Sequence, residues 1–238
     1  SYESLSNIWP CQIMQKTTSA PPLPSLRAAI HPQASKPWGF LAVLDKISIG
    51  TRTYLYPMPC VIVGAIVNGK PNFSTIAYID IVQRMPPMIA FASHRTHYTN
   101  IGIREHRTFS VNIPTEHQVE VTDHIGLVSG KNVDKSEIFT SFYGKLATAP
   151  MIRECPLNLE CRVVQVVDVG ASHEIFVGEI VDTFTSEGFM TNGLPDISKM
   201  KPFVFSMHDN NYWGIGKHLG RAWGVGKGYG KKDTEESS

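Results

Sequence analysis

The chain has 238 residues, of which 42% are hydrophobic and 18% charged, and its formal net charge is +1. This length predicts one or two domains with a core large enough to fold without a disulfide or metal staple. The balance of 22 basic and 21 acidic residues argues against a protein held to nucleic acid by bulk positive charge. No apolar run approaches the roughly 18 residues that a membrane helix needs. We therefore expect neither nucleic acid nor a membrane as a partner.

The two ends of the chain differ in composition from its middle. Residues 1–49 include a stretch rich in Pro, Ser and Ala, and we expect them to form an N-terminal arm and lead-in. A transit peptide is a less favoured interpretation of this end. Residues 221–238 are Gly-rich and then charged, which predicts a disordered tail. Four cysteines are too few for a disulfide scaffold and favour a reducing, cytoplasmic location.

The region between the ends, residues 50–220, reads mostly as strands. Two β-branched runs, 60–67 and 71–81, are joined by Asn68-Gly69. Asn-Gly between such runs is a strong hairpin signal, because both central residues of a type I′ turn need positive φ. Further strands are predicted over residues 88–93, 109–113, 159–169, 174–185 and 203–207.

Helices are fewer and fall in the connections between strands. Thr99 is a good N-cap for a helix over 100–106, and Thr115 precedes a second helix over 116–128. A third, short helix is predicted to begin near residue 134 or 136 and to end near Gly144. This arrangement predicts a mainly β fold, an antiparallel barrel with short helical insertions, rather than alternating strands and helices.

The familiar catalytic motifs are absent from the sequence. It has no P-loop, nucleophile elbow, H-E-x-x-H or C-x-x-C. His94 and His97 lie three residues apart where a strand ends, so they need not share a face, and we predict no metal site. The even spacing of Cys155 and Cys161 would place both on one face of an extended strand. We favour two buried strand cysteines there over a redox or metal pair.

Residues 93–99 form the first segment suited to ligand chemistry. Hydroxyl groups, the Arg95 guanidinium and the N-terminus of the predicted helix meet there, and such a set of donors and positive charge suits a phosphate. The alternative is an ordinary capped helix with a solvated arginine.

Residues 123–135 form a second candidate segment, with Ser, Lys and backbone N–H groups in a glycine-loosened loop that can wrap an anionic or polyhydroxy group. The alternative is a polar surface loop. Asn72, Ser74 and Thr75 add polar groups on a strand, where they can meet the edge of a flat heterocycle.

The order and spacing of these segments carry a resemblance. Residues 55–185 run LYPMPCVIVGAIVNGKPNFSTIAY, MPPMIAFASHRTHYTNIGIREHRTFSVNIP, DHIGLVSGKNVDK and APMIRECPLNLECRVVQVVDVGASHEIFVGEIV, and Tyr212-Trp213-Gly214 follows later. Over about residues 50–220 the chain resembles the flavin reductase-like, FMN-binding split-barrel family, in its flavoredoxin and ferric reductase branch. Tyr78 stands where that family commonly has Trp, and Ser136 where it often has Phe, which leaves the shape of the substrate open.

The resemblance implies a homodimeric antiparallel split barrel with one FMN per subunit, near the interface. By position it implies that the isoalloxazine ring is bordered by Asn72, Ser74, Thr75 and Ala77. It implies that the phosphate is held by Ser93, Arg95 and Thr99, with Asn112 near the ribityl chain or the ring. The phosphate and ribityl side is expected to be closed by Ser129, Gly130, Asp134 and Lys135. His173 matches a histidine near the nicotinamide or flavin face; alternatively, it is a turn residue that hydrogen-bonds backbone.

The function expected from the resemblance is that of an FMN-dependent oxidoreductase. Hydride would come from NADH or NADPH, and electrons would pass to a flavin, ferric or protein acceptor. One alternative is a flavoredoxin-like electron carrier, reduced by a protein partner without nicotinamide turnover. Another is a flavin-binding barrel without turnover. The sequence lacks the clustered cysteines of an iron–sulfur centre, so electrons must come from outside. The final acceptor, the choice of nicotinamide, and whether FMN stays bound or cycles as a substrate are left open.

Overall fold

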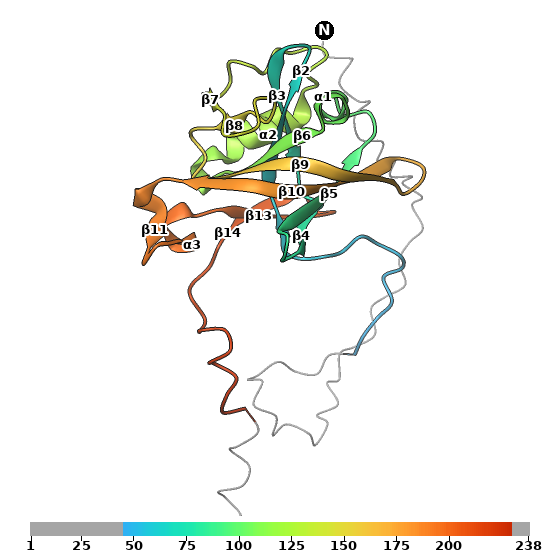
Figure 1. The fold of residues 1–238 in the computed structure, drawn as a ribbon. Coiled ribbons are helices and arrows are strands. Elements are labelled where there is room, and N and C mark those ends of the chain that lie inside the picture. Colours follow the sequence, from blue (N-terminus) through green and yellow to red (C-terminus); the bar gives the residue numbers. More distant parts are fainter. Residues whose placement is uncertain (1–44, 230–238) are drawn as a thin grey trace, which may run out of the picture. The chain divides into compact units, whose positions relative to one another are not determined.

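The computed structural model describes residues 45–229, and its helices and strands lie in one unit that begins at Tyr54 (Figure 1). Residues 1–44 and 230–238 lie outside the described range, so the predictions for most of the arm and for half of the tail stay predictions. The strands are β1 (Met58–Pro59), β2 (Val61–Val67), β3 (Lys70–Ile76), β4 (Ile79–Gln83), β5 (Met88–His94), β6 (Thr108–Ile113), β7 (Ser141–Phe142), β8 (Met151–Ile152), β9 (Leu157–Asp168), β10 (His173–Thr185), β11 (Met190–Thr191), β12 (Leu194–Pro195), β13 (Phe203–Ser206) and β14 (Asn211–Gly214). The α-helices are α1 (Thr99–His106), α2 (Val119–Leu127) and α3 (Ile197–Met200), with 3₁₀ turns at Glu116–Gln118 and Glu187–Phe189.

The central feature is a seven-stranded antiparallel sheet in the order β3-β2-β6-β9-β10-β5-β4. Its edge strands β3 and β4 are consecutive in the chain and are separated by Ala77 and Tyr78 alone. The three Cα–Cα steps from Ile76 to Ile79 reach about 11 Å at most, so the sheet must curl until these ends of its edge strands adjoin. Tyr78 already bonds to β5, the neighbour of β4, because its carbonyl accepts from Ala92 N at 2.8 Å. Among the described strands no ladder joins β3 to β4, so the sheet is curled without being closed by pairing.

The mainly β prediction is confirmed, and most of the predicted strands occur, with one correction. The run predicted as a single strand over 71–81 is broken at residues 77–78, because its two halves pair with different partners. The predicted hairpin turn is confirmed: Asn68 has φ 50° and Gly69 φ 75°, the left-handed values that a type I′ turn needs.

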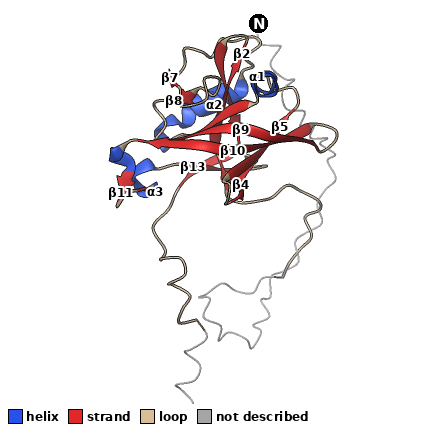
Figure 2. Ribbon diagram, in the orientation of Figure 1, coloured by secondary structure: helices blue, strands red, loops and turns tan. Residues whose placement is uncertain are grey.

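Two hydrophobic clusters cover the two faces of the β2–β3 hairpin. Successive residues of a strand face opposite ways, and Val63 therefore packs into one cluster while Ile62 packs into the other. The larger cluster fills the curled sheet and includes Phe91, Phe109 and Phe176. The smaller cluster packs β2 and β3 against α2 and the segment before β9. Figure 2 shows α1 and α2 beside the sheet, where the two clusters would otherwise be exposed to solvent.

The two longer helices begin differently from one another. Before α2, Thr115 and Gln118 form a capping box, as the sequence pattern favours. At α1 the N-cap is Tyr98 rather than the predicted Thr99, and no side chain caps the helix. The short helix α3 was not predicted.

The predicted third helix near residues 134–144 is wrong. The segment forms turns and then β7, and within it Thr140 N bonds to the Glu154 carboxylate instead of to a helix ladder. Just beyond the segment, Glu160 accepts from the N–H groups of Lys145 and Leu146. Glu160 is buried, and a buried carboxylate needs such partners.

Cys155 and Cys161 are both buried, but they do not share one face of a strand, as their even spacing had suggested. Cys155 precedes β9 and lies in the smaller cluster, whereas Cys161 lies on β9 in the larger one. Burial raises the pKa of Cys60 and of Cys155 to about 12, so both thiols stay protonated at neutral pH.

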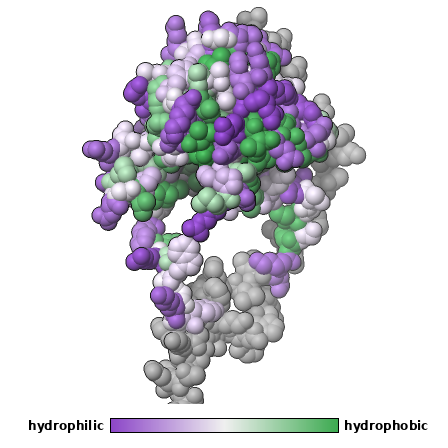
Figure 3. Space-filling model, viewed as in Figure 1, coloured by the Kyte–Doolittle hydropathy of each residue, from purple (hydrophilic) through white to green (hydrophobic). Residues whose placement is uncertain are grey.

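The surface of the unit mixes hydrophilic and hydrophobic residues (Figure 3). On the edge strand β4 and in the turn after it, Ile81, Val82 and Met85 are exposed. None of the helices in the described range is long and apolar enough to cross a membrane.

Candidate functional site

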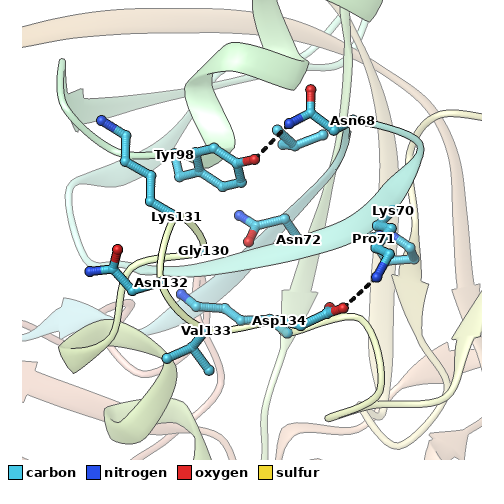
Figure 4. A pocket seen from close by; sticks show the side chains of 12 residues that line it. Asn68, Lys70, Pro71, Asn72, Tyr98, Gly130, Lys131, Asn132, Val133 and Asp134 are labelled. Carbon is cyan, nitrogen blue, oxygen red and sulfur yellow. Dashed lines mark hydrogen bonds and ion pairs between the residues drawn. The ribbon is translucent and has the colours of Figure 1, made fainter.

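A pocket of about 340 Å³ opens between the β2–β3 hairpin, the start of α1 and the loop over 130–135 (Figure 4). It is lined by Val67, Asn68, Lys70, Pro71, Asn72, Tyr98, Gly130, Lys131, Asn132, Val133, Asp134 and Lys135. Of the residues predicted for the site, the pocket brings together Asn72, Gly130, Asp134 and Lys135. Segments more than 50 residues apart in the sequence therefore meet here.

The inner wall of the pocket includes the buried Asn72, whose side chain is paired with one that lies behind it. Asn72 Nδ2, on β3, donates a hydrogen bond to Thr99 Oγ1, at the start of α1, over 2.7 Å. Helix α1 lies close to the hairpin because it has glycine at position 102, where a Cβ would come within 1.9 Å of Ile66 O. The pair thus fixes α1 against β3 at the back of the pocket.

Gly130 brings the loop against this wall. A Cβ at that position would lie 2.1 Å from Asn72 Oδ1 and 2.5 Å from the Tyr98 ring, so any larger residue would push the loop outward. Figure 4 shows the loop backbone at Gly130 passing beside Asn72 and Tyr98. At the rim, Asn68 Nδ2 donates to the Tyr98 hydroxyl at 2.9 Å.

Lys135 anchors the far end of the same loop. Its buried ammonium donates to Phe73 O at 2.9 Å and to Ile125 O at 2.7 Å, which ties the loop to β3 and α2. Burial lowers the pKa of Lys135 to about 8. One of its three N–H groups remains for another acceptor.

Asp134 lies at the outer edge of the loop and is paired with Lys70 at 2.6 Å. The hydrogen bond from Lys70 holds the pKa of the Asp134 carboxyl well below its usual range. The predicted Ser129 shapes the loop, because its Oγ accepts from Lys131 N and its carbonyl accepts from Asn132 N.

The N-terminus of α1 lies beside this pocket without a side-chain cap. The Thr99 hydroxyl, which could cap the helix, instead accepts from Asn72. The N–H groups of Asn100 and Ile101 bond to the carbonyls of His97 and Tyr98, and the positive end of the helix dipole is what favours an anion here. The arrangement therefore suits a phosphate.

Arg95 lies away from the pocket. Its guanidinium pairs with Asp168 at the end of β9 and donates to Gly170 O at 3.0 Å. A bond from Gly170 N, and then the charge of Arg95, lower the pKa of the Asp168 carboxyl. The guanidinium is thus committed to the β9–β10 turn rather than to the phosphate position that the resemblance implies.

His173, at the start of β10, belongs to a group of His and Tyr side chains. This group lies next to the strand that is predicted to border the isoalloxazine ring. Its ring lies 5.3 Å from that of His94 and 5.9 Å from that of Tyr78, whose hydroxyl contacts Met207 Sδ at 2.8 Å. Partial burial, and then His94, lower its pKa. Its Nδ1 contacts the Ser172 side chain at 2.8 Å, so the bond in this turn is to a side chain rather than to backbone.

The remaining predicted residues do not line the pocket. Ser74 and Thr75 lie on β3, and Ala77 in the break before β4; the Thr75 hydroxyl donates to Thr122 O. Ser93 is buried behind the start of α1, where it donates to Asn100 Oδ1.

The prediction for Asn112 needs correction. The residue is fully buried, and its amide donates to Ile62 O and Ser110 Oγ while its oxygen accepts from Ile152 N and Asn158 Nδ2. All its hydrogen-bonding capacity is used inside the protein, so it joins β6 to its neighbours and has none left for a ligand.

Sequence reasoning missed several residues of the site. Tyr98 lay in the segment chosen for its hydroxyls and arginine, but nothing marked its ring as a pocket wall. Asn68 and Lys70 were assigned to the hairpin, and only the fold brings that hairpin to the loop. Within residues 45–229 no group of three or more His, Cys, Asp or Glu side chains could hold a metal ion.

Comparisons with known proteins agree with this geometry. Residues 53–198 match the model of the flavin reductase like domain. A flavoredoxin structure from Methanosarcina acetivorans is 45% identical, with a TM-score of 0.75 over 77% of this chain and 98% of that chain. The flavoredoxin of Desulfovibrio vulgaris (Miyazaki F) is 33% identical, with a TM-score of 0.72 over 77% of this chain and all of the other. An NADPH-flavin oxidoreductase of Streptomyces viridifaciens is 24% identical over 148 residues, 60% of this chain and 69% of that protein. The chain belongs to the flavin reductase-like family.

Proposed function

We propose that this chain is an FMN-binding oxidoreductase that takes hydride from NADH or NADPH and passes electrons to a flavin, ferric or protein acceptor. The observation that carries the proposal is the pocket beside the uncapped N-terminus of α1, in a chain of the flavin reductase-like family. The isoalloxazine chemistry belongs to the cofactor, which accepts and releases the electrons when it is bound. The protein supplies the binding, the orientation and the exclusion of water.

The donor set of the pocket fits a flavin side chain. A phosphate requires N–H donors and positive charge. These are supplied by Lys131 on the loop, by the remaining N–H of Lys135 and by the positive end of the α1 dipole. Hydroxyl groups of a ribityl chain require polar partners, and the Asn72 amide provides one on the inner wall.

In this proposal Arg95 reaches the phosphate by leaving Asp168. The side chain of Arg95 is 35% exposed and that of Asp168 is 71% exposed, and an exposed ion pair of this kind is worth about 1 kcal/mol or less. A dianionic ligand can therefore compete for the guanidinium. His173 and Tyr78 shape the face on which the nicotinamide or another flat substrate would lie.

A second candidate is a flavoredoxin-like electron carrier that a protein partner reduces without nicotinamide turnover. The likeness to two flavoredoxins, at 45% and 33% identity, favours it. A flavin-binding barrel without turnover would share the site and differ only in its kinetics.

We also propose that the chain forms a homodimer. The exposed apolar side chains on β4 and after it, Ile81, Val82 and Met85, support this idea, because contiguous exposed apolar surface marks interaction sites. Light scattering coupled to size-exclusion chromatography would give the mass of a dimer. The mass of a single chain would contradict it.

The functional proposals are separated by two measurements on the full chain. FMN is first titrated into the purified protein and followed by its visible spectrum, and saturable uptake is expected. The flavin-loaded protein is then mixed anaerobically with NADH or NADPH. Bleaching by either supports the oxidoreductase, whereas binding without bleaching favours the carrier, and no uptake of FMN rejects all three flavin-dependent functions.

A further inference from the structure

The pocket beside α1 carries more positive than negative charge. Of the described residues that line it, three are lysines, Lys70, Lys131 and Lys135, and one, Asp134, is acidic. That carboxylate is already paired with the Lys70 ammonium, with 2.6 Å between Nζ and Oδ2. A ligand that brings two negative charges would balance the surplus.

The Tyr98 hydroxyl is a hydrogen-bond donor at the rim of this pocket. An NH₂ group only donates, so the Tyr98 oxygen is the acceptor in its 2.9 Å bond with Asn68 Nδ2. That bond leaves the hydroxyl proton of Tyr98 for another acceptor. Both residues line the pocket, and Figure 4 shows the hydroxyl and the amide meeting at its edge. A ligand atom that only accepts can therefore use this proton.

The ion pair between Lys70 and Asp134 joins the β2–β3 hairpin to the loop at another part of the rim (Figure 4). The Lys70 side chain is 67% exposed and that of Asp134 is 52% exposed. An exposed pair of this kind is weak and is screened by salt. The pair also uses one of the three N–H groups of the ammonium, so two remain. Lys70 is therefore able to bind an anion that enters the pocket.

These groups match a phosphate monoester in both charge and hydrogen bonding. A lysine ammonium only donates, and the acceptor side of the Tyr98 hydroxyl is occupied by Asn68. A fully ionised phosphate monoester carries two negative charges, and its oxygens only accept. A flavin without phosphate offers neither property.

We propose that the rim of this pocket is a subsite for a phosphate monoester, in which Lys70 exchanges Asp134 for the phosphate and the Tyr98 hydroxyl donates to it. For its ligands the inference rests on the proposed function, which supplies two such groups. One is the 5′-phosphate of FMN, and the other is the 2′-phosphate of NADPH.

Binding of ligand pairs that differ only in this phosphate tests the role of Lys70. FMN is compared with riboflavin, and NADP⁺ with NAD⁺, by isothermal titration. Lys70→Met is expected to weaken binding about 3- to 10-fold for the phosphorylated member of one pair, and to leave the other member unchanged. A loss confined to FMN identifies the flavin phosphate as the occupant, and a loss confined to NADP⁺ identifies the 2′-phosphate.

Lys145→Met is the matched control. Lys145 is also 67% exposed and pairs with Asp182 at 2.8 Å, outside the pocket. It should bind all four ligands like the unaltered chain. If Lys70→Met behaves like this control, or changes both members of each pair equally, the subsite is overturned.

Two further variants test the partners of the phosphate. Tyr98→Phe keeps the ring and removes the donor, so it should weaken the same ligand about 3-fold. Asp134→Asn removes the competing charge but keeps the oxygen that accepts from Ser136 N at 2.9 Å. It should strengthen binding of that ligand about 2- to 5-fold. Unchanged or weaker binding by Asp134→Asn would overturn the exchange of Asp134 for phosphate.

Failure of this inference can be told apart from failure of the proposed function. If the unaltered chain binds neither flavin nor nicotinamide, the proposed function fails, and inorganic phosphate then decides the inference. Saturable phosphate binding that Lys70→Met weakens would sustain the subsite, and no binding would overturn it.

Discussion

The two halves of the proposed flavin site are built differently. The pocket half, defined by Asn72, Thr99, Gly130 and Lys135, is held by buried hydrogen bonds that join a strand, a helix and a loop. The turn half is defined by Arg95, whose guanidinium lies in an exposed ion pair. Buried polar contacts are costly to break, whereas exposed ion pairs are not. The pocket half is therefore organised before a ligand arrives, and the turn half can adjust to it.

The largest effect is expected from His97, the residue before the pocket residue Tyr98. The pKa of this ring is about 6.5 unfolded and about 4 folded, so between these values the unfolded chain binds more protons. Stability should therefore rise with pH across this window and lose that contribution as the pH falls through it. The contribution amounts to at most about 3 kcal/mol.

This prediction is checked by urea unfolding of the native chain and of His97→Gln from pH 4 to pH 7. Since the other titrating groups are shared, their contributions cancel in the difference between the two proteins. The native chain should gain stability relative to the variant as the pH rises. Parallel curves would show that His97 is not perturbed in the folded state.

A smaller effect is expected from Gly130→Ala, which tests whether the loop must touch the pocket wall. The added methyl group would lie 2.1 Å from Asn72 Oδ1, so the loop or the amide must move. Overpacking of this kind costs about 1–3 kcal/mol, and FMN affinity should fall at least several-fold. Gly188→Ala is a matched control, because nothing lies within 4 Å of a Cβ there. Equal FMN affinity for both variants would remove the loop from the site.

The smallest effects are expected in the turn half. Arg95→Ala should weaken FMN binding, because a charge-assisted contact is lost, whereas Asp168→Asn should strengthen it by releasing the guanidinium. Each change should be no more than about 5-fold, since the pair is exposed. Isothermal titration with FMN and riboflavin measures both. If Arg95→Ala changes riboflavin binding as much as FMN binding, the guanidinium does not hold the phosphate.

The sequence predicts the fold better than it predicts the individual contacts. Alternating apolar residues and the Asn68-Gly69 turn identified the strands, because these are local signals. The predicted helix near residue 134 failed, since Thr140 N within it is taken by Glu154, which lies outside that segment. Such long-range pairings leave no local signal.

In the candidate site too, the segments were predicted better than the individual contacts. The loop and the strand that form the pocket were predicted from their polar residues and from the resemblance. Asn112 and Arg95 were assigned by position, but the fold commits one to buried neighbours and the other to Asp168. His97 lay in a segment already singled out, yet the burial that lowers its pKa has no signal in that segment.

Titration of FMN into the unaltered chain asks whether the pocket beside α1 binds flavin. We expect saturable binding of one FMN per chain, with affinity reduced in Gly130→Ala and retained in Gly188→Ala. No uptake of FMN by the unaltered chain would show that it does not bind this flavin, and a Gly130→Ala variant that binds FMN as tightly as the unaltered chain would show that the pocket is not the flavin site.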